Sequence, residues 1–85
     1  MQTKPLSELS VVDVIHLLES LNLRNYCAVF QKNAIDGPSL MNCKSVYDVK
    51  ELFGIDITAK ARKLYEEIVK FKSTGVSLTF LSEVS

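Results

Sequence analysis

The spacing of apolar residues between positions 59 and 72 constrains the fold more than any other feature of the sequence. These residues follow the i, i+3, i+4, i+7 pattern of an amphipathic helix: Ala61, Leu64, Tyr65, Ile68 and Phe71. A lone helix of this length is marginal in water, so its apolar face must pack on other parts of the chain. Because the chain has 85 residues, we expect one domain with a small core around this helix.

Two shorter helical patterns lie in the first part of the chain. Ser10 and Asp13 resemble a capping box, with Asp in place of the usual Glu, and predict a helix that begins near residue 11. Asn22 tolerates the left-handed conformation and is expected to end that helix. A second helix is predicted over about 24–32.

Capping residues predict two more short helices. The row “IDGPSLM” contains several turn-forming residues, and Asp36 is expected to cap a helix of little more than one turn. Ser45 and Asp48 form an S-x-x-D signature that predicts a helix over about 46–52. Thr58 is then expected to cap the long helix.

The two ends of the chain have different patterns. Residues 1–8 are mostly polar, and we expect them to form a flexible arm. After Gly75 the apolar residues alternate with polar ones, which is a strand pattern: Val76, Leu78 and Phe80. A strand without a partner is only marginally stable. Three alternatives therefore remain for the tail: it docks on the bundle, it leads into a neighbouring domain, or it is frayed.

Together these patterns predict an all-α fold, a compact bundle of five helices with a long C-terminal helix and an extended tail. We expect a flexible N-terminal arm over 1–8, the helical domain over 9–72, and a C-terminal extension or linker over 73–85. The core is predicted from the apolar positions of the helices: Leu17, Leu18, Leu21, Tyr26, Phe30, Leu40, Leu52, Leu64 and Ile68.

Composition excludes several classes of protein. An apolar content of 47% is too high for a disordered chain. No apolar run approaches the ~18 residues that cross a bilayer, and no signal peptide opens the chain, so we expect an intracellular, cytoplasmic protein. Cys27 and Cys43 are expected to be free, buried thiols, because they sit within apolar patterns and a chain with no export signal suggests a reducing compartment. Neither has a nearby histidine to activate it or a second cysteine at metal-ligand spacing.

The residues suited to catalysis are few. His16 is the only histidine, and it shares the polar face of its helix with Asp13 and Glu19. No nucleophile, phosphate-binding loop or metal-ligand spacing accompanies this set. We interpret the face as solvated, and we expect no enzymatic activity, cofactor, metal or small-molecule substrate.

The order of these helices, and several short sequence motifs within them, resemble the sterile alpha motif (SAM) domain family. The matching text is “LSVVDVIHLLESLNLRNYCAVFQKNAIDGPSLM”, “SVYDVKELFGI” and “TAKARKLYEEIVKF”. Its most specific part is L-x-L-x-x-Y-x-x-x-F, which begins at Leu21, followed by I-D-G at Ile35. The resemblance covers about residues 9–71, and it implies a SAM-like bundle that acts as a protein–protein interaction module within a larger scaffold or signalling protein.

The departures from the family pattern limit what can be transferred. Leu9 and Leu17 stand where many members carry Trp, and Asn22 replaces the usual Gly after the first helix. The frequent Gly-His before the Arg of the last helix is here Lys60-Ala61. That change falls on a surface that many SAM domains use for binding, so the identity of the partner does not carry over.

The start of the long helix is basic. Residues 57–72 carry five basic and two acidic side chains, a net charge of +3, although the whole chain is neutral. Lys60, Arg62 and Lys63 stand where cations oppose the helix dipole. Either Asp56 and solvent offset this cost, or the charges serve a partner; we favour the second interpretation, because the resemblance implies an interaction surface, the end-helix surface, at this place.

The resemblance also implies a complementary mid-loop surface, which here would include Asp36, Asp48 and Glu51. Asp36 and Asp48 have predicted capping roles, whereas Glu51 has none, and Lys44 and Lys50 nearby weaken the negative charge. The expected partner is another SAM domain, either a second copy or a different protein. A contact between two different surfaces builds open polymers or a hetero-pair.

Other functions remain open. Some SAM domains bind RNA hairpins through a basic cluster at the start of the last helix, and the same three basic residues would serve here. A net charge of zero and only two arginines stand against RNA. A lipid-binding role is less favoured, since the apolar tail has no basic residues, and a death-fold or helix-turn-helix bundle is the alternative fold.

Overall fold

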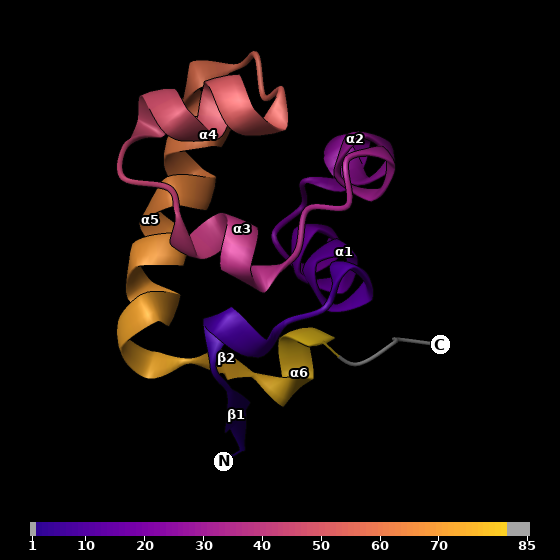
Figure 1. The fold of residues 1–85 in the computed structure, drawn as a ribbon, viewed down its shortest axis with the longest axis vertical. Helices are drawn as coiled ribbons and strands as arrows, with labels where there is room; N and C mark the ends of the chain where they lie inside the picture. Colours follow the sequence, from indigo (N-terminus) through magenta and orange to yellow (C-terminus); the bar gives the residue numbers. More distant parts are fainter. Residues whose placement is uncertain (1, 82–85) are drawn as a thin grey trace.

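The long helix predicted from the apolar spacing is α5 (Thr58–Thr74), which runs along one side of the molecule (Figure 1). The structure is a computed structural model that describes residues 2–81. The other helices in this part of the chain are η1 (Leu6–Glu8), α1 (Val11–Ser20), η2 (Arg24–Tyr26), α2 (Cys27–Lys32), α3 (Gly37–Met41), α4 (Val46–Phe53) and α6 (Leu78–Leu81). Two short strands, β1 (Thr3–Lys4) and β2 (Val76–Ser77), pair antiparallel. The predicted helical bundle is confirmed at this level, with one small sheet added.

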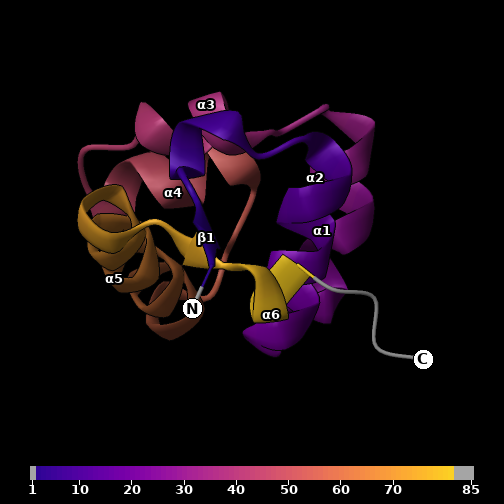
Figure 2. The same cartoon turned by 90° about the horizontal axis from the view of Figure 1, so that it is seen from below.

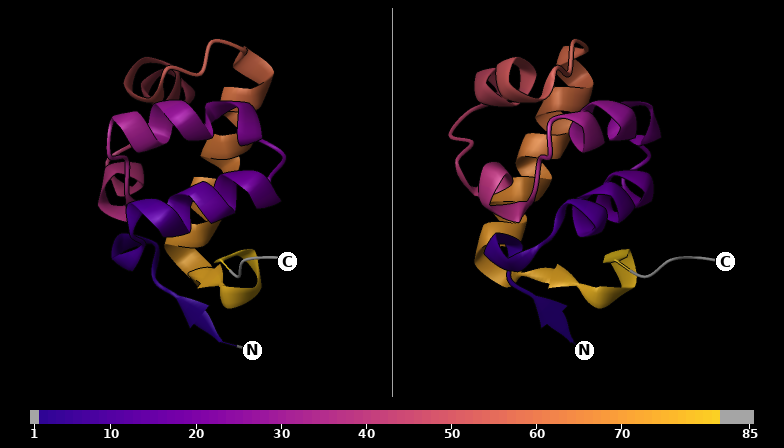
Figure 3. Two further views of the ribbon diagram at one scale, coloured as in Figure 1. Left: turned by 90° about the vertical axis from the view of Figure 1, so that its right-hand side faces the viewer. Right: turned by 45° about the vertical axis from the view of Figure 1, so that its right-hand side comes forward.

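The helices form two groups that meet over a shared core. α1 and α2 pack side by side and run in opposite directions (Figure 3). α4 packs against α5, and α3 lies between this pair and the α1–α2 pair (Figure 1). Seen from below, β1, β2 and α6 bridge one end of the molecule from α5 across to α1 (Figure 2).

The caps predicted for α1, α3 and α4 are present. Ser10 and Asp13 form a capping box, in which each backbone N–H donates to the other residue's side-chain oxygen at 3.1 Å. Asn22 has a positive φ of 62°, as its place after α1 predicts. The side chains of Asp36 and Ser45 cap α3 and α4. Local sequence therefore determines where these helices begin.

The start of α5 differs from the prediction. The helix begins at Thr58, and its N-cap is Ile57, whose side chain makes no capping hydrogen bond. The Thr58 hydroxyl instead accepts a hydrogen bond from Nζ of Lys50 at 3.0 Å. The predicted cap at Thr58 is wrong, because the helix starts one residue too early for Thr58 to hold the N-cap position.

The predicted core is confirmed with one exception. The confirmed residues are buried: Leu17, Leu18, Leu21, Tyr26, Phe30, Leu40, Leu64 and Ile68. Leu52 was predicted to join them, but 57% of it is exposed. Val49 and Phe53, four residues apart on α4, form the face that packs on the core. Leu52 lies outside this face.

The N-terminal segment does not fit the prediction of a flexible arm. Leu6 is buried in the core, and β1 pairs with β2. Lys4 reaches α1, where its Nζ donates to Oδ2 of Asp13 at 2.8 Å. Most polar residues of this segment are exposed, but Lys4 is half-buried and Leu6 enters the bundle. A polar composition therefore did not mean a flexible arm.

The tail docks on the bundle, but only its first part is a strand. Val76 is fully buried, whereas the strand predicted through Phe80 gives way to α6 after Ser77. The side chains of His16 and Ser20 on α1 bind backbone oxygens of α6. The ring of Phe80 packs edge-on against Phe71 of α5. These contacts favour a helical turn over an alternating strand, and residues 82–85 of the predicted extension lie outside the described part.

Gly37 lies where η1 and α3 pack most closely. A Cβ added to Gly37 would lie 1.9 Å from the backbone oxygen of Leu6 and 2.9 Å from the backbone nitrogen of Leu9. The Gly37 N–H donates to the Leu9 oxygen at 2.9 Å. The glycine of the I-D-G row is therefore required by this close approach, in addition to its place in the first turn of α3.

Candidate functional site

The three basic residues predicted as an interaction surface share the first two turns of α5. Arg62 and Lys63 are exposed, and Lys60 is half-buried. Within residues 2–81 the ion pairs join Lys4 to Asp13 and Arg24 to Glu19, so the charges at this helix end are not neutralised by a salt bridge there. The first turn of α5 also has no acidic residue. The positive charge of this helix end is therefore available to a partner.

Lys60 is held in place by an aromatic ring. Its Nζ lies 5.8 Å from the centre of the Tyr26 ring, a cation–π arrangement. The Tyr26 hydroxyl donates to Oδ1 of Asp56 at 3.3 Å. Burial raises the pKa of Tyr26, and the nearby charge of Asp56 raises it further. The Tyr26 hydroxyl therefore stays neutral. Through its hydrogen bond, Tyr26 connects Asp56, which precedes α5, to the core.

Two residues of this surface were missed by the sequence analysis. Lys50 was expected to weaken the acidic surface, but its Nζ donates a hydrogen bond to Thr58 at the start of α5, so its charge adds to the basic end. Ile57 lies beside these charges with 47% of its surface exposed. The only feature of the sequence that could have indicated a role for Ile57 in this surface is its position directly before the basic start of the helix. We define the basic surface as Lys50, Ile57, Lys60, Arg62 and Lys63.

The predicted acidic residues lie on two different helices. Asp36 precedes α3, and its Oδ1 accepts hydrogen bonds from the backbone nitrogen and hydroxyl of Ser39 at 3.1 and 3.0 Å. Oδ2 of Asp48 accepts from the backbone nitrogen of Lys44 at 2.9 Å. Both carboxylates are half-buried, and both accept hydrogen bonds from backbone N–H groups. Their main role is therefore to stabilise the local structure.

Glu51 is the freest of the three acids. It is exposed, and it makes no hydrogen bond or ion pair with other residues of the described part. Asp48 precedes it by three positions on α4, so the two share one side of that helix. Asp36 remains on α3, and no direct contact joins it to the other two.

A shallow groove lies between α3 and the end of α4. It is lined by Asn33, Ile35, Ser39, Asn42, Leu52 and Phe53. Ile35 and Phe53 belong to the core, whereas Leu52 is exposed. Ser39 binds Asp36, so one carboxylate lies next to a lining residue of the groove. Asp48 and Glu51 belong to α4, the helix that contributes Leu52 and Phe53. We define the acidic groove as the six lining residues with Asp36, and we keep Asp48 and Glu51 as the acidic residues of the adjoining helix.

His16 does not occupy a solvated face as predicted. It is half-buried, and its Nδ1 lies 2.9 Å from the backbone oxygen of Leu81. Because a carbonyl oxygen only accepts, Nδ1 carries the proton and donates to it. The histidine therefore holds α6 against α1. Asp13 is likewise occupied, by Lys4 and the capping box, whereas Glu19 is exposed, with Nε of Arg24 at 3.9 Å.

The cysteines are free thiols, as predicted. Burial raises the pKa of Cys43 to about 11, and burial also raises the pKa of Cys27. Both thiols therefore stay protonated and unreactive near neutral pH. Within residues 2–81, no group of three His, Cys, Asp or Glu side chains could hold a metal ion.

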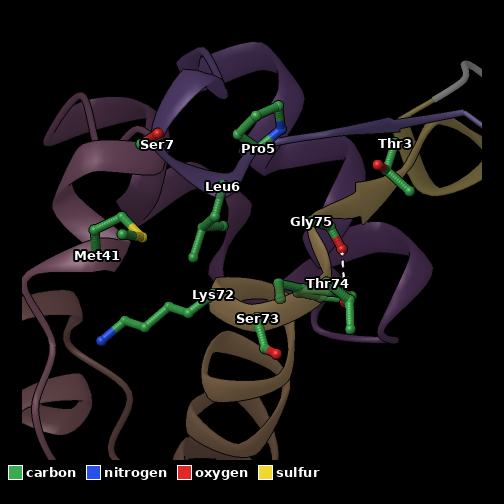
Figure 4. A pocket seen from close by; sticks show the side chains of 10 residues that line it. Thr3, Pro5, Leu6, Ser7, Met41, Lys72, Ser73, Thr74 and Gly75 are labelled. Carbon is green, nitrogen blue, oxygen red and sulfur yellow. Dashed lines mark hydrogen bonds between the residues drawn. The ribbon is translucent and has the colours of Figure 1, made fainter.

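A second hollow lies between the N-terminal segment and the end of α5 (Figure 4). Its lining includes Thr3, Ser7 and Lys72. Nζ of Lys72 donates to the backbone oxygen of Cys43 at 3.0 Å, so this charge is already bound within the fold. Among the described residues that line the hollow, none is an acid, a histidine or a cysteine.

Comparisons with known proteins were negative. Neither a scan against models of protein families nor searches of the curated proteins and of the solved structures found a match to this chain. Among the described helices, none has both the length and the apolar character needed to cross a membrane.

Proposed function

We propose that the chain is a SAM-like protein-interaction module that docks another SAM domain, either a second copy or a different protein. The basic surface at the start of α5 would bind the acidic groove of the partner. The module would belong to a larger intracellular scaffold or signalling protein, and the proposal includes no catalytic step or cofactor.

The observation that carries the proposal is the basic helix end itself. Cations in the first turn of a helix oppose its dipole, which costs about 0.3–1 kcal/mol each at low salt. Lys60 lies in the first turn of α5, and a fold that needed only stability would favour an acid in its place. Arg62 and Lys63 follow in the second turn, are exposed, and have no acidic partner within residues 2–81. Binding to an acidic partner is the simplest reason for keeping three cations at this end of the helix.

The end-helix assignment is tested by Lys63→Glu. We expect the dissociation constant for self-association to rise about tenfold or more, because opposite charges steer docking and like charges repel. Lys70→Glu, an exposed basic position near the other end of α5, is the matched control and should leave association unchanged. Sedimentation across concentration measures both, and circular dichroism confirms that each variant keeps its helices.

Two outcomes would contradict the proposal. One is equal association of the Lys63 and Lys70 variants. The other is a wild-type chain that stays monomeric at high concentration and binds no SAM domain. An RNA hairpin bound with a steep salt dependence would instead favour the nucleic-acid function, since phosphate contacts release counterions.

A further inference from the structure

The tail after Gly75 consists of two parts that are buried to different degrees. Val76, in β2, is fully buried, and its strand pairs with β1. α6 (Leu78–Leu81) follows directly, and none of these four residues is buried. Phe80 and Leu81 are half-buried where they pack on the core. The first part is therefore anchored in the fold, whereas the second part, which we call the strap (Leu78–Leu81), lies on its surface.

The strap is too short to hold its helical conformation alone. It has four residues, and a helix leaves its last four carbonyl groups without a partner inside the helix. An isolated turn of this length is unstable in water, because one hydrogen bond does not offset the entropy of nucleation. The conformation of the strap therefore depends on the surface beneath it.

α1 supplies the hydrogen-bond donors that the strap lacks. Nδ1 of His16 donates to the backbone oxygen of Leu81 at 2.9 Å. The hydroxyl of Ser20 donates to the backbone oxygen of Phe80 at 3.1 Å. His16 and Ser20 are one turn apart and lie on one side of α1. This side of α1 therefore receives the carbonyl end of a helix.

An aromatic contact adds to this arrangement. The ring centres of Phe80 and Phe71 are 5.8 Å apart in an edge-on arrangement, and Phe71 is buried near the end of α5. Figure 2 shows α6 beside α1. We define the strap site as His16, Ser20 and Phe71. Since Phe71 lies near the end of α5, the strap site is separate from the basic surface at the start of that helix.

We propose that the strap is displaceable and that the strap site also binds the last turn of a helix from another protein. The strap shows what this occupant needs, namely two free carbonyl groups at the end of a helix and an aromatic side chain beside them. The strap sequence has no charged residue, so shape and hydrogen bonds select the occupant. Because strap and occupant compete for one site, the strap limits access to it. The inference uses neither the basic surface nor the acidic groove, and it does not depend on the proposed function.

Hydrogen exchange tests whether the strap opens by itself. We expect the amides of residues 79–81 to exchange at least about a hundredfold faster than those of Leu64 and Ile68, which are fully buried in α5. Urea below the unfolding transition should leave the strap rates unchanged, because local opening exposes little surface, whereas it should speed exchange at Leu64 and Ile68. An equal urea dependence at all of these amides would mean that the strap opens only when the whole domain unfolds, and the inference would be wrong.

The second test supplies a helix end in trans. The probe is an alanine- and lysine-based helical peptide that ends in the strap sequence, Leu-Thr-Phe-Leu, with an amidated C-terminus. We expect it to bind Phe80→Ser, whose strap has lost the ring contact with Phe71, about tenfold more tightly than the wild-type chain. An NMR titration measures the affinity and should shift the signals of His16 and Ser20. Thr79→Ala, at an exposed position of the strap, is the matched control and should bind the peptide as weakly as the wild type.

Each outcome of the titration decides the inference. Equal affinity of the wild type and Phe80→Ser would mean that strap and peptide do not share a site, and the inference would be wrong. The same conclusion follows if Phe80→Ser binds no peptide at a concentration of about 1 mM, or if a peptide with serine in place of its phenylalanine binds equally well. If circular dichroism shows that Phe80→Ser disrupts the bundle, Leu81→Gly takes its place, because glycine weakens the helical turn and leaves the strap site intact.

Discussion

At the scale of single residues, Gly37 has the least freedom to change. Its backbone lies against Leu6 and Leu9, and an added Cβ would overlap backbone atoms that cannot turn away. We expect Gly37→Ala to lower the free energy of unfolding by about 2–3 kcal/mol, because η1 and α3 would have to separate. Urea unfolding monitored by circular dichroism measures the loss.

Gly54→Ala is the matched control for this prediction. Gly54 has a positive φ of 70°, but an added Cβ would meet only Cγ1 of Val29 at 3.6 Å, an ordinary contact. Its substitution should cost about 1–2 kcal/mol, from backbone strain alone. A smaller effect at Gly37 than at Gly54 would show that η1 adjusts without cost.

The ion pair of Lys4 and Asp13 predicts a pH dependence. The hydrogen bond from Lys4 holds the pKa of Asp13 below its ordinary value of 3.8, although partial burial opposes the shift. A carboxyl group with a lowered pKa stabilises the fold above its unfolded pKa, and this contribution disappears as the pH falls through the folded pKa. Lys4→Met removes the largest cause of the shift.

We therefore expect Lys4→Met to be less stable than the wild type by about 0.5 kcal/mol near neutral pH, the usual size for a partly exposed pair. The difference should shrink as the pH falls through the lowered pKa of Asp13, because protonation removes the charge that Lys4 binds. Urea unfolding at a series of pH values from neutral downward tests this. Lys32→Met, at an exposed position without an ion pair in the described part, should show no such pH dependence.

At the scale of elements, sequence predicted what is local. The caps at Ser10, Asp36 and Ser45 were predictable, because each depends on a side chain bonding to a backbone group a few positions away. The left-handed residue after α1 was predictable because Asn tolerates a positive φ. Neighbouring residues alone set these features.

What sequence missed depends on contacts between distant segments. The period of Val76, Leu78 and Phe80 indicated a strand, but α6 is fixed by His16 and Ser20, about 60 positions away. The arm was missed because β1 has its partner in β2, at the other end of the chain. In the candidate site, the basic residues were found from the charge at the start of the long helix and from the family resemblance. The groove could not be found in this way, because residues far apart in the sequence line it, from Asn33 to Phe53.

Val76 tests whether the tail belongs to the domain. It is fully buried although it follows the end of α5, and it lies in the strand that pairs with β1. We expect Val76→Ala to lower the free energy of unfolding by about 1–3 kcal/mol through the cavity it leaves. Leu78→Ala, at a position 38% exposed, is the control and should cost less. Equal and negligible effects would show that the tail is dispensable, which thermal unfolding of a chain ending at residue 75 would confirm.

At the scale of the whole molecule, the proposed contact uses two different surfaces of one bundle, and this would determine how copies assemble. The basic surface lies at the start of α5, and the groove lies between α3 and α4. When a copy binds through one surface, its other surface stays open for the next copy. The assembly should therefore lack a fixed number of subunits unless the geometry closes a ring.

This predicts the concentration dependence of the mass. The weight-average mass from sedimentation should keep rising with concentration beyond that of a dimer, because each addition leaves the same two surfaces free. Raising the salt concentration from about 0.05 to 0.5 M should shift the whole curve to higher protein concentration, since screening shortens the Debye length around the exposed charges. A plateau at the dimer mass would indicate a symmetric contact. A curve insensitive to salt would show that Arg62 and Lys63 do not contribute to docking, and the function would then have to rest on the apolar groove alone.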